Sequence, residues 1–213
     1  MRRRRFISIL GAACLRAQTP PSSKDDWPQF RGNPQLTGVA ASFLPATLKL
    51  VWTYEAGDSI ESSAAIVAGV VYVGSMAAGL ISLDLQTGKL RWKYPVQDGI
   101  EESSPAVRGG IVYVGDLSGV LHAVNAQDGK SLWTLRTGAE IKSSPVVVGD
   151  RLLVGSYDGN LYCVAARTGA GTGWARGWAA PDRLTRRAGL MPLRRATFRN
   201  WPKATKRKSR LKI

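Results

Sequence analysis

The chain has 213 residues and a formal net charge of +15, values that fit one or two domains and that alone suggest a nucleic-acid or anionic-membrane partner. The charge lies at the ends, since residues 170–213 hold thirteen Lys and Arg against one acid and residues 1–24 hold six against none. The two cysteines, Cys14 and Cys163, exclude a disulfide framework and any cysteine metal cluster. Because the middle of the chain is mildly acidic, we do not expect nucleic acid as its partner.

Residues 1–24 have the layout of an export signal. Arginines at positions 2 to 5 precede a short apolar stretch, Phe6 to Leu15, and a polar Pro/Ser segment follows. The apolar stretch is too short to cross a bilayer, so we expect no transmembrane helix in the mature chain. Arg3, Arg4, Phe6 and Ile7 also resemble the RRxF core of a twin-arginine signal, which leaves the export route open. The sequence therefore predicts a periplasmic or secreted protein, with outer-membrane association as an open alternative.

Residues 25–169 contain a pattern of about forty residues that occurs three times. Its blocks are "IESSAAIVAGVVYVGS", "IEESSPAVRGGIVYVGD" and "IKSSPVVVGDRLLVGS". We divide the repeats as 50–89, 90–130 and 131–169. Three tryptophans and three glycines recur at spacings of 40 or 41 residues: Trp52, Trp92, Trp133, Gly88, Gly129 and Gly169.

Each repeat separates into four short strands joined by tight turns. β-branched and aromatic residues fill the strands, and Gly or Asp marks the breaks. In the second repeat the strands are 104–107, 111–115, 120–125 and 131–136. Four antiparallel strands in forty residues are typical of a β-propeller blade. A stacked β-solenoid is the alternative, but its coils are shorter and lack two-residue hairpins. The sequence therefore predicts an all-β fold, a partial β-propeller of about three four-stranded blades.

The repeat resembles a known family. The segments "DLQTGKLRW" and "NAQDGKSLW" are similar to the tryptophan-docking repeat of PQQ-like (quinoprotein alcohol dehydrogenase-like) β-propellers, and "DWPQFRGNPQLTG" resembles the start of many exported bacterial members. The resemblance implies that each Trp packs against the neighbouring blade and that each TG-type turn joins the two outer strands. It assigns structural docking roles to Trp52, Trp92, Trp133, Gly88, Gly129 and Gly169.

The family resemblance also raises the question of a quinone cofactor. Family enzymes that use pyrroloquinoline quinone carry a vicinal cysteine pair, a Ca²⁺-binding carboxylate with an amide, and a catalytic Asp. No motif of this sequence matches those positions, so we assign no catalytic, cofactor-binding or metal residue, and PQQ stands only as an implication of the family. The single histidine, His122, aligns with Ile81 and Tyr162, which favours a packing role over catalysis. We expect a non-catalytic protein.

Paired serines occur at one point of every repeat, as Ser62-Ser63, Ser103-Ser104 and Ser143-Ser144. A ligand site usually breaks the symmetry of a repeat, whereas these pairs preserve it. We therefore expect structural hydroxyls near the innermost strand. A polar ring lining a channel is the alternative.

The repeat stops after Gly169. The next docking Trp would fall at position 173, where Gly173 stands, and we interpret Trp174 as a coincidence. We expect residues 170–213 to form an irregular or disordered basic tail. Our hypothesis is that a longer propeller was truncated and that a shifted reading frame produced the tail; a nucleic-acid-binding arm is the rival interpretation.

Three blades leave two open apolar faces, because a propeller of about four to eight blades closes by docking its last blade on its first. We therefore expect a protein partner in the cell envelope or self-association through these faces. The function that fits is an interaction or assembly scaffold of the bacterial envelope. The alternative is a fragment of a PQQ-dependent quinoprotein oxidoreductase.

Overall fold

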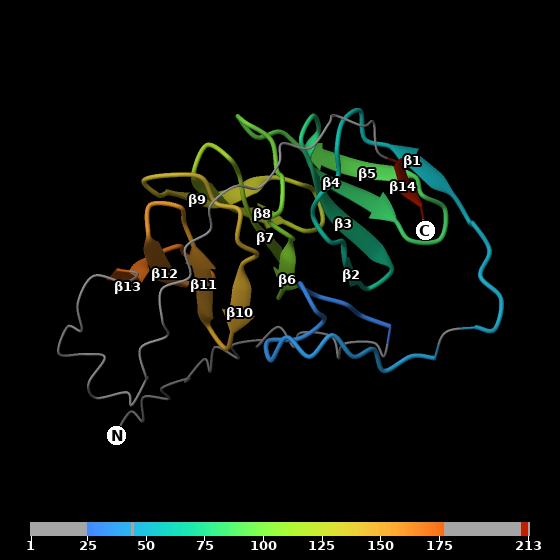
Figure 1. Cartoon of the computed structure of the whole chain (residues 1–213), viewed down its shortest axis with the longest axis horizontal. Helices are drawn as coiled ribbons and strands as arrows, with labels where there is room; N and C mark the ends of the chain where they lie inside the picture. The colour runs from blue at the N-terminus through green and yellow to red at the C-terminus, as the bar shows by residue number, and fades with distance from the viewer. Residues whose placement is uncertain (1–24, 44, 177–209, 213) are drawn as a thin grey trace, which may run out of the picture.

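Three four-stranded antiparallel sheets stand side by side and form the body of the protein (Figure 1). The structure, a computed structural model, describes residues 25–43, 45–176 and 210–212, so the predicted export signal and most of the basic tail lie outside the described residues. Within the described residues all regular structure is β. The prediction of an all-β fold with three propeller-type blades is confirmed.

The three blades share one strand order, in which each strand pairs with its sequence neighbours. The first blade consists of β2 (Ala65–Val67), β3 (Val70–Ser75), β4 (Gly79–Asp84) and β5 (Leu90–Tyr94). The second consists of β6 (Ala106–Arg108), β7 (Ile111–Gly115), β8 (Val120–Asn125) and β9 (Ser131–Arg136). The third consists of β10 (Val146–Val148), β11 (Arg151–Gly155), β12 (Asn160–Ala165) and β13 (Gly171–Arg176). The last strand of the third blade lies beyond Gly169, where the recognisable repeat stops.

A further short sheet lies beside the first blade. It pairs β1 (Thr53–Glu55) with β14 (Arg210–Lys212), antiparallel, with Tyr54 opposite Leu211. β5 and β9, the outer strands of the first and second blades, contain Trp92 and Trp133. β1 directly follows Trp52, the corresponding tryptophan, so by this correspondence β1 is also an outer strand. The first strand of each sequence repeat is thus the outer strand of one sheet. The other three strands of the repeat form the three inner strands of the next sheet.

The turn between the third and fourth strands explains why glycine recurs there. Gly88 has a φ of 67° and Gly129 a φ of 71°, values at which a side chain is strained. The Gly88 amide donates to the Asp84 carbonyl at 2.9 Å, and Asp84 Oδ1 accepts from the Thr87 amide and hydroxyl. Asp at the start and Gly at the end therefore close the hairpin with local hydrogen bonds.

The apolar core lies between the blades, not within one of them. The side of the first blade that carries Tyr72 and Leu80 packs on the side of the second blade that carries Val112 and Val114. The next interface repeats this arrangement between the second and third blades. This is why β3 and β7 are apolar on both faces and almost entirely buried.

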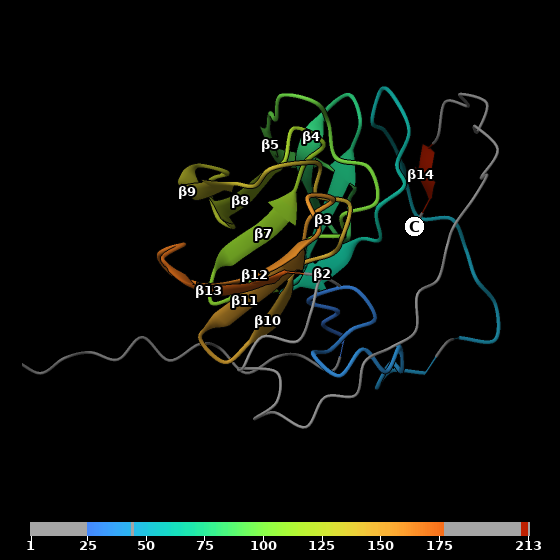
Figure 2. The same ribbon diagram turned by 60° about the vertical axis from the view of Figure 1, so that its left-hand side comes forward.

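The amino-terminal segment connects two blades along their inner strands. Trp27 pairs with Ile66 of β2, exchanging two backbone hydrogen bonds of 2.6 and 2.9 Å, and the next carbonyl, of Pro28, accepts from Val107 of β6 at 2.7 Å. Figure 2 shows this segment beneath β2. It adds backbone hydrogen bonds to strands that would otherwise present an open edge.

Candidate functional site

The recurring tryptophans each contact the blade that follows their own. Trp92 Nε1, on the first blade, donates to the carbonyl of Ala126 on the second at 3.0 Å. Its ring covers the glycine turn, since a Cβ on Gly129 would lie 2.8 Å from Trp92 Cδ2. Each indole therefore needs a glycine beneath it and a carbonyl beside it on the next blade.

The other two tryptophans make the same contacts. Trp52 Nε1 donates to Leu85 at 2.9 Å, and Trp133 Nε1 donates to Ala166 at 3.1 Å. Their rings cover Gly88 and Gly169. The structure thus brings the six residues assigned by the repeat together as three tryptophan–glycine pairs: Trp52 with Gly88, Trp92 with Gly129, and Trp133 with Gly169.

A tyrosine hydroxyl reinforces two of these junctions. Tyr72 Oη donates to Ala126 O at 3.3 Å and Tyr113 Oη donates to Ala166 O at 3.0 Å, so one carbonyl accepts from both an indole and a phenol. Burial raises the pKa of Tyr113 to about 12. Sequence reasoning missed this role, although the recurrence of Tyr in "VVYVG" and "IVYVG" carried the signal.

An isoleucine fills a space left by a glycine at each of the two junctions. A Cβ added to Gly74 would overlap Ile100, which enters the second blade, and one on Gly115 would overlap Ile141, which enters the third. Both isoleucines are fully buried. The glycine therefore provides a space that one specific side chain of the next blade occupies.

The paired serines link the inner strands in series. The Ser63 amide donates to Ser104 Oγ at 2.9 Å, and the Ser104 amide donates to Ser144 Oγ at 3.0 Å. The other serine of each pair binds its own blade, as where Ser103 Oγ accepts from the Gly115 amide at 3.0 Å. The hydroxyls thus hold backbone groups within and between blades.

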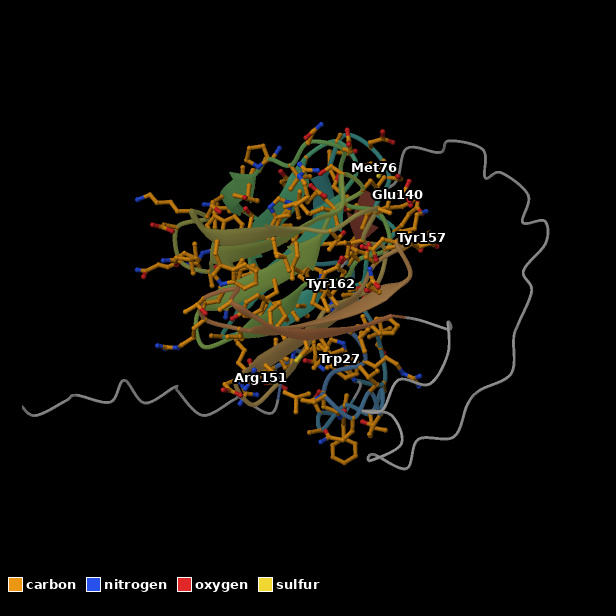
Figure 3. The ribbon with its side chains drawn as sticks, turned by 90° about the vertical axis from the view of Figure 1, so that its left-hand side faces the viewer. Trp27, Met76, Glu140, Arg151, Tyr157 and Tyr162 are labelled. Carbon is orange, nitrogen blue, oxygen red and sulfur yellow. The ribbon has the colours of Figure 1, made fainter. Side chains whose placement is uncertain are left out.

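Among the described residues, no further blade lies beyond the third, and these partners are missing on its side away from the second blade (Figure 3). Gly173 pairs with Cys163, where the other blades have Trp92 opposite Ser82 and Trp133 opposite Ala123. Leu153 takes the place of the tyrosine, and a Cβ on Gly155 would meet only Ser143 of its own blade. We call this side the front face, and it consists of Val146, Val148, Leu153, Gly155, Leu161 and Cys163.

A buried polar node joins the first and second blades. Asp116 is 1% exposed and His122 is 7% exposed. His122 Nε2 lies 3.0 Å from Asp116 Oδ2, and His122 Nδ1 lies 3.1 Å from the hydroxyl of Tyr94 on the neighbouring blade. An ionised Asp116 only accepts, which places a proton on Nε2 and lets Nδ1 accept from Tyr94. The histidine thus connects two fixed groups across a blade junction.

Hydrogen bonds keep the Asp116 carboxylate ionised. Burial by itself raises the pKa of Asp116, but the hydrogen bonds from His122, from the Val120 amide and from Ser118 outweigh burial and hold the pKa below its usual value. Oδ1 accepts from the Val120 amide at 2.8 Å, Oδ2 lies 3.0 Å from His122 Nε2, and Ser118 Oγ lies 2.8 and 2.9 Å from the two oxygens. Both oxygens of this carboxylate therefore have partners within the protein.

A second node joins the second and third blades. Asp158 Oδ2 accepts from the Tyr162 hydroxyl at 2.6 Å and from the amide of Gly138, which follows β9, at 2.8 Å. Oδ1 accepts from the Asn160 amide at 2.9 Å. Burial opposes these bonds, yet together they lower the pKa of Asp158 to about 2. Tyr162 is the counterpart of His122, but its hydroxyl bonds Asp158 of its own blade, and Asp158 makes the contact with the second blade.

The described residues do not fit a metal–quinone site. No group of three or more His, Cys, Asp or Glu side chains converges among the residues that the structure describes. The two inner carboxylates, Asp116 and Asp158, are fully used in the nodes. Over the same residues no helix is long and apolar enough to cross a membrane. What the geometry repeats among the described residues is contact between blades.

Comparison with known proteins identifies the family. A family model described as outer membrane protein assembly factor BamB matches residues 37–190. No curated protein matches the chain.

Solved structures share the fold. A europium-containing methanol dehydrogenase is 23% identical with a TM-score of 0.62, over 72% of this chain and 32% of that one. Quinohemoprotein alcohol dehydrogenase from Comamonas testosteroni is 24% identical with a TM-score of 0.61, over 70% and 27%. BamB from Moraxella catarrhalis is 26% identical with a TM-score of 0.53, over 59% and 39%. The chain thus spans about a quarter to two fifths of these relatives. Together with the repeated blade junctions, the family match shows that this chain belongs to the PQQ-like β-propeller family described as outer membrane protein assembly factor BamB.

Proposed function

We propose that this chain is a non-catalytic, exported β-propeller protein that binds other proteins in the bacterial cell envelope, in the periplasm or at the outer membrane. The observation that carries the proposal is the match of residues 37–190 to the BamB family, whose description is that of an assembly factor. The six docking residues serve this role by holding the blades together: Trp52, Trp92, Trp133, Gly88, Gly129 and Gly169. The site geometry supports it, because the inner carboxylates and the single histidine are bound to neighbouring blades.

The proposal is tested by removing the gene and measuring outer-membrane protein levels by quantitative mass spectrometry. We expect several outer-membrane proteins to fall together and to recover when the full chain is restored. Fractionation with a carboxyl-terminal epitope tag should place the chain in the envelope fraction. Unchanged outer-membrane protein levels together with a cytoplasmic location would contradict the proposal.

A substitution separates a structural histidine from a catalytic one. His122→Tyr introduces the residue that the third blade carries at this position, where the Tyr162 hydroxyl donates to Asp158 of the same blade. We expect this variant to restore outer-membrane protein levels as the unchanged chain does. A folded His122→Tyr protein that fails to restore them would show that the imidazole has a chemical role.

The second candidate is a piece of a PQQ-dependent oxidoreductase, and the dehydrogenase folds favour it. If this were the function, the full chain would bind pyrroloquinoline quinone in the presence of Ca²⁺ or a lanthanide ion, and would reduce an artificial dye with an alcohol. We expect neither a shift in the quinone absorbance nor dye reduction. Either signal, at a stoichiometry near one quinone per chain, would favour the oxidoreductase.

A further inference from the structure

The front face of the third blade has the composition of a blade interface, but no blade covers it in the part of the chain that the structure describes. Leu161 is 45% exposed and Val148 is 50% exposed, whereas Leu80 and Leu121, the counterparts of Leu161, are fully buried. Ile100 and Ile141 fill the space beside Gly74 and Gly115, the counterparts of Gly155. Beside Gly155 itself, an added Cβ would meet only Ser143. A contiguous apolar face of this kind marks an interaction surface.

The chain contains a matching segment that its own described blades do not use in the same way. Trp52 directly precedes β1, and Ile60 lies eight residues after Trp52, the spacing that separates Trp92 from Ile100 and Trp133 from Ile141. In the two complete junctions this tryptophan and isoleucine belong to the outer strand of a blade and to the chain that leaves it. In the described residues β1 pairs with β14 and not with a blade.

We propose that residues 52–63 of a second copy of this chain complete the third blade. β1 of the second copy takes the place of β13 beside β12, so that its Trp52 lies opposite Cys163, where Gly173 now stands. Its Ile60 enters the space at Gly155. Trp52 meanwhile keeps its own hydrogen bond to Leu85 and its contact with Gly88, which places the second copy's first blade next to the third blade.

The polar groups at the two surfaces complement each other. The serine series runs from Ser63 to Ser144, and in the described part of the chain no hydrogen bond reaches Ser63 Oγ or leaves the Ser144 amide. In the assembled pair the Ser144 amide of one copy donates to Ser63 Oγ of the other. Glu61, the residue after Ile60, meets Lys142, which already pairs with Glu101. The series of hydrogen bonds and the charges thus continue across the interface.

Symmetry determines how many copies the interface joins. Each copy carries one segment and one front face, so the contact runs head to tail and closes into a ring if the rotation allows. Two copies of three blades give six blades, which lies within the range of about four to eight at which propellers close. The proposal goes beyond the scaffold role, because a monomeric chain could still bind envelope proteins.

Sedimentation of the full chain tests the proposal. We expect a concentration-dependent dimer, and we expect Leu161→Asp to raise its dissociation constant at least about tenfold by burying a charge. The control is Leu132→Asp on the outer strand β9, where the leucine is 48% exposed but lies outside the front face. Far-UV circular dichroism checks that both variants fold. A wild-type monomer at every concentration, or equal effects of the two substitutions, would overturn the proposal.

Disulfide trapping tests the register independently of stability. In a background with both native cysteines replaced by serine, Ser63→Cys and Ser144→Cys chains with different tags are mixed and oxidised. We expect a covalent heterodimer, and no covalent dimer when either chain is oxidised alone. The positive control is Ser63→Cys with Ser104→Cys in one chain. These residues should link internally, because the Ser63 amide nitrogen already lies 2.9 Å from Ser104 Oγ. Failure of the mixed chains to link while this control links would overturn the proposed register.

Discussion

At the residue scale, the glycines beneath the tryptophans meet two demands at once. They adopt a positive φ, and they leave the space into which an indole ring packs. A glycine that meets only the first demand occurs in the same blade, because Gly109 has a φ of 58° and an added Cβ would have no neighbour within 4 Å. The two demands can therefore be measured separately.

We expect Gly129→Ala to destabilise the protein more than Gly109→Ala. The backbone strain costs about 1–2 kcal/mol at either position, and displacing the Trp92 ring adds about 1–3 kcal/mol at Gly129 alone. Urea unfolding followed by tryptophan fluorescence measures both losses. Equal losses would show that the indole does not depend on the absent Cβ.

The Asp158 node predicts a loss of stability in acid. An unfolded Asp has a pKa of about 4, and the hydrogen bonds lower the folded pKa of Asp158 to about 2. The stabilisation is therefore complete above about pH 4 and is lost as the pH falls from 4 towards 2. We expect Asp158→Asn to lower the melting temperature at pH 6 and to flatten its dependence on pH below 4. Asp150→Asn, at an exposed carboxylate, is the control and should retain the steep acid dependence.

At the element scale, each blade is held by its neighbours in one direction. Trp and Tyr of one blade donate to a carbonyl of the next, and the amide of one serine donates to the hydroxyl of the next. At each junction, one blade supplies the hydrogen-bond donors and the following blade supplies the acceptors, so the two sides of the junction differ in chemistry. The first and third blades consequently expose different chemistry.

The serine series predicts unequal effects of two similar substitutions. Ser104→Ala removes the hydroxyl that accepts from the Ser63 amide in a part-buried hydrogen bond, and we expect a loss of about 0.5–1.5 kcal/mol. Ser63→Ala removes a hydroxyl that accepts no hydrogen bond in the described part of the chain, so its effect should be below about 0.5 kcal/mol. Unfolding at protein concentrations low enough to keep the chain monomeric measures both. Similar losses would contradict the role assigned to the Ser104 hydroxyl.

The strands could be predicted because turn residues delimit them. In the second blade, strands 111–115, 120–125 and 131–136 are observed as predicted, and the first runs Ala106–Arg108 instead of 104–107. The first strand differs because Ser104 serves the inter-blade series and pairs no neighbouring strand. The repeat bounds at 90 and 131 do not coincide with blade bounds, because each repeat supplies the outer strand of one blade and the three inner strands of the next.

The contacts between blades were only partly predictable. The tryptophan and serine positions repeat, so their recurrence could be seen, but their partners lie on another repeat and become visible only in three dimensions. The Asp116–His122–Tyr94 node does not repeat, because the first blade has Ser75 and Ile81 at the corresponding positions and the third has Ser156 and Tyr162. A periodic pattern could not reveal it.

At the scale of the whole molecule, burial decreases towards the third blade. The strands β3 and β7 are almost fully buried, whereas β11 alternates between buried and half-buried or exposed residues because no described residue covers the front face with a further blade. The stability of a sheet against local opening depends on this packing. The third blade should therefore be the least protected of the three.

We expect hydrogen exchange to follow that order. Amides of β11 and β12 should exchange faster than those of β7 and β8 when the chain is dilute, and they should become protected as the concentration rises and the front face is covered. Mass spectrometry of peptides from both blades measures the difference. Equal protection of all three blades in dilute solution would show that the uncovered face does not weaken the third blade.

The offset between sequence repeat and blade has an evolutionary consequence. A segment that begins at Trp92 and ends at Leu132 contains both partners of one junction, because Trp92 on the outer strand of one blade covers Gly129 of the next. An in-frame duplication of these residues would add one blade whose two junctions both use contacts that already exist. Recombination between repeats can therefore lengthen or shorten such a protein by whole blades without the need for any new packing to arise.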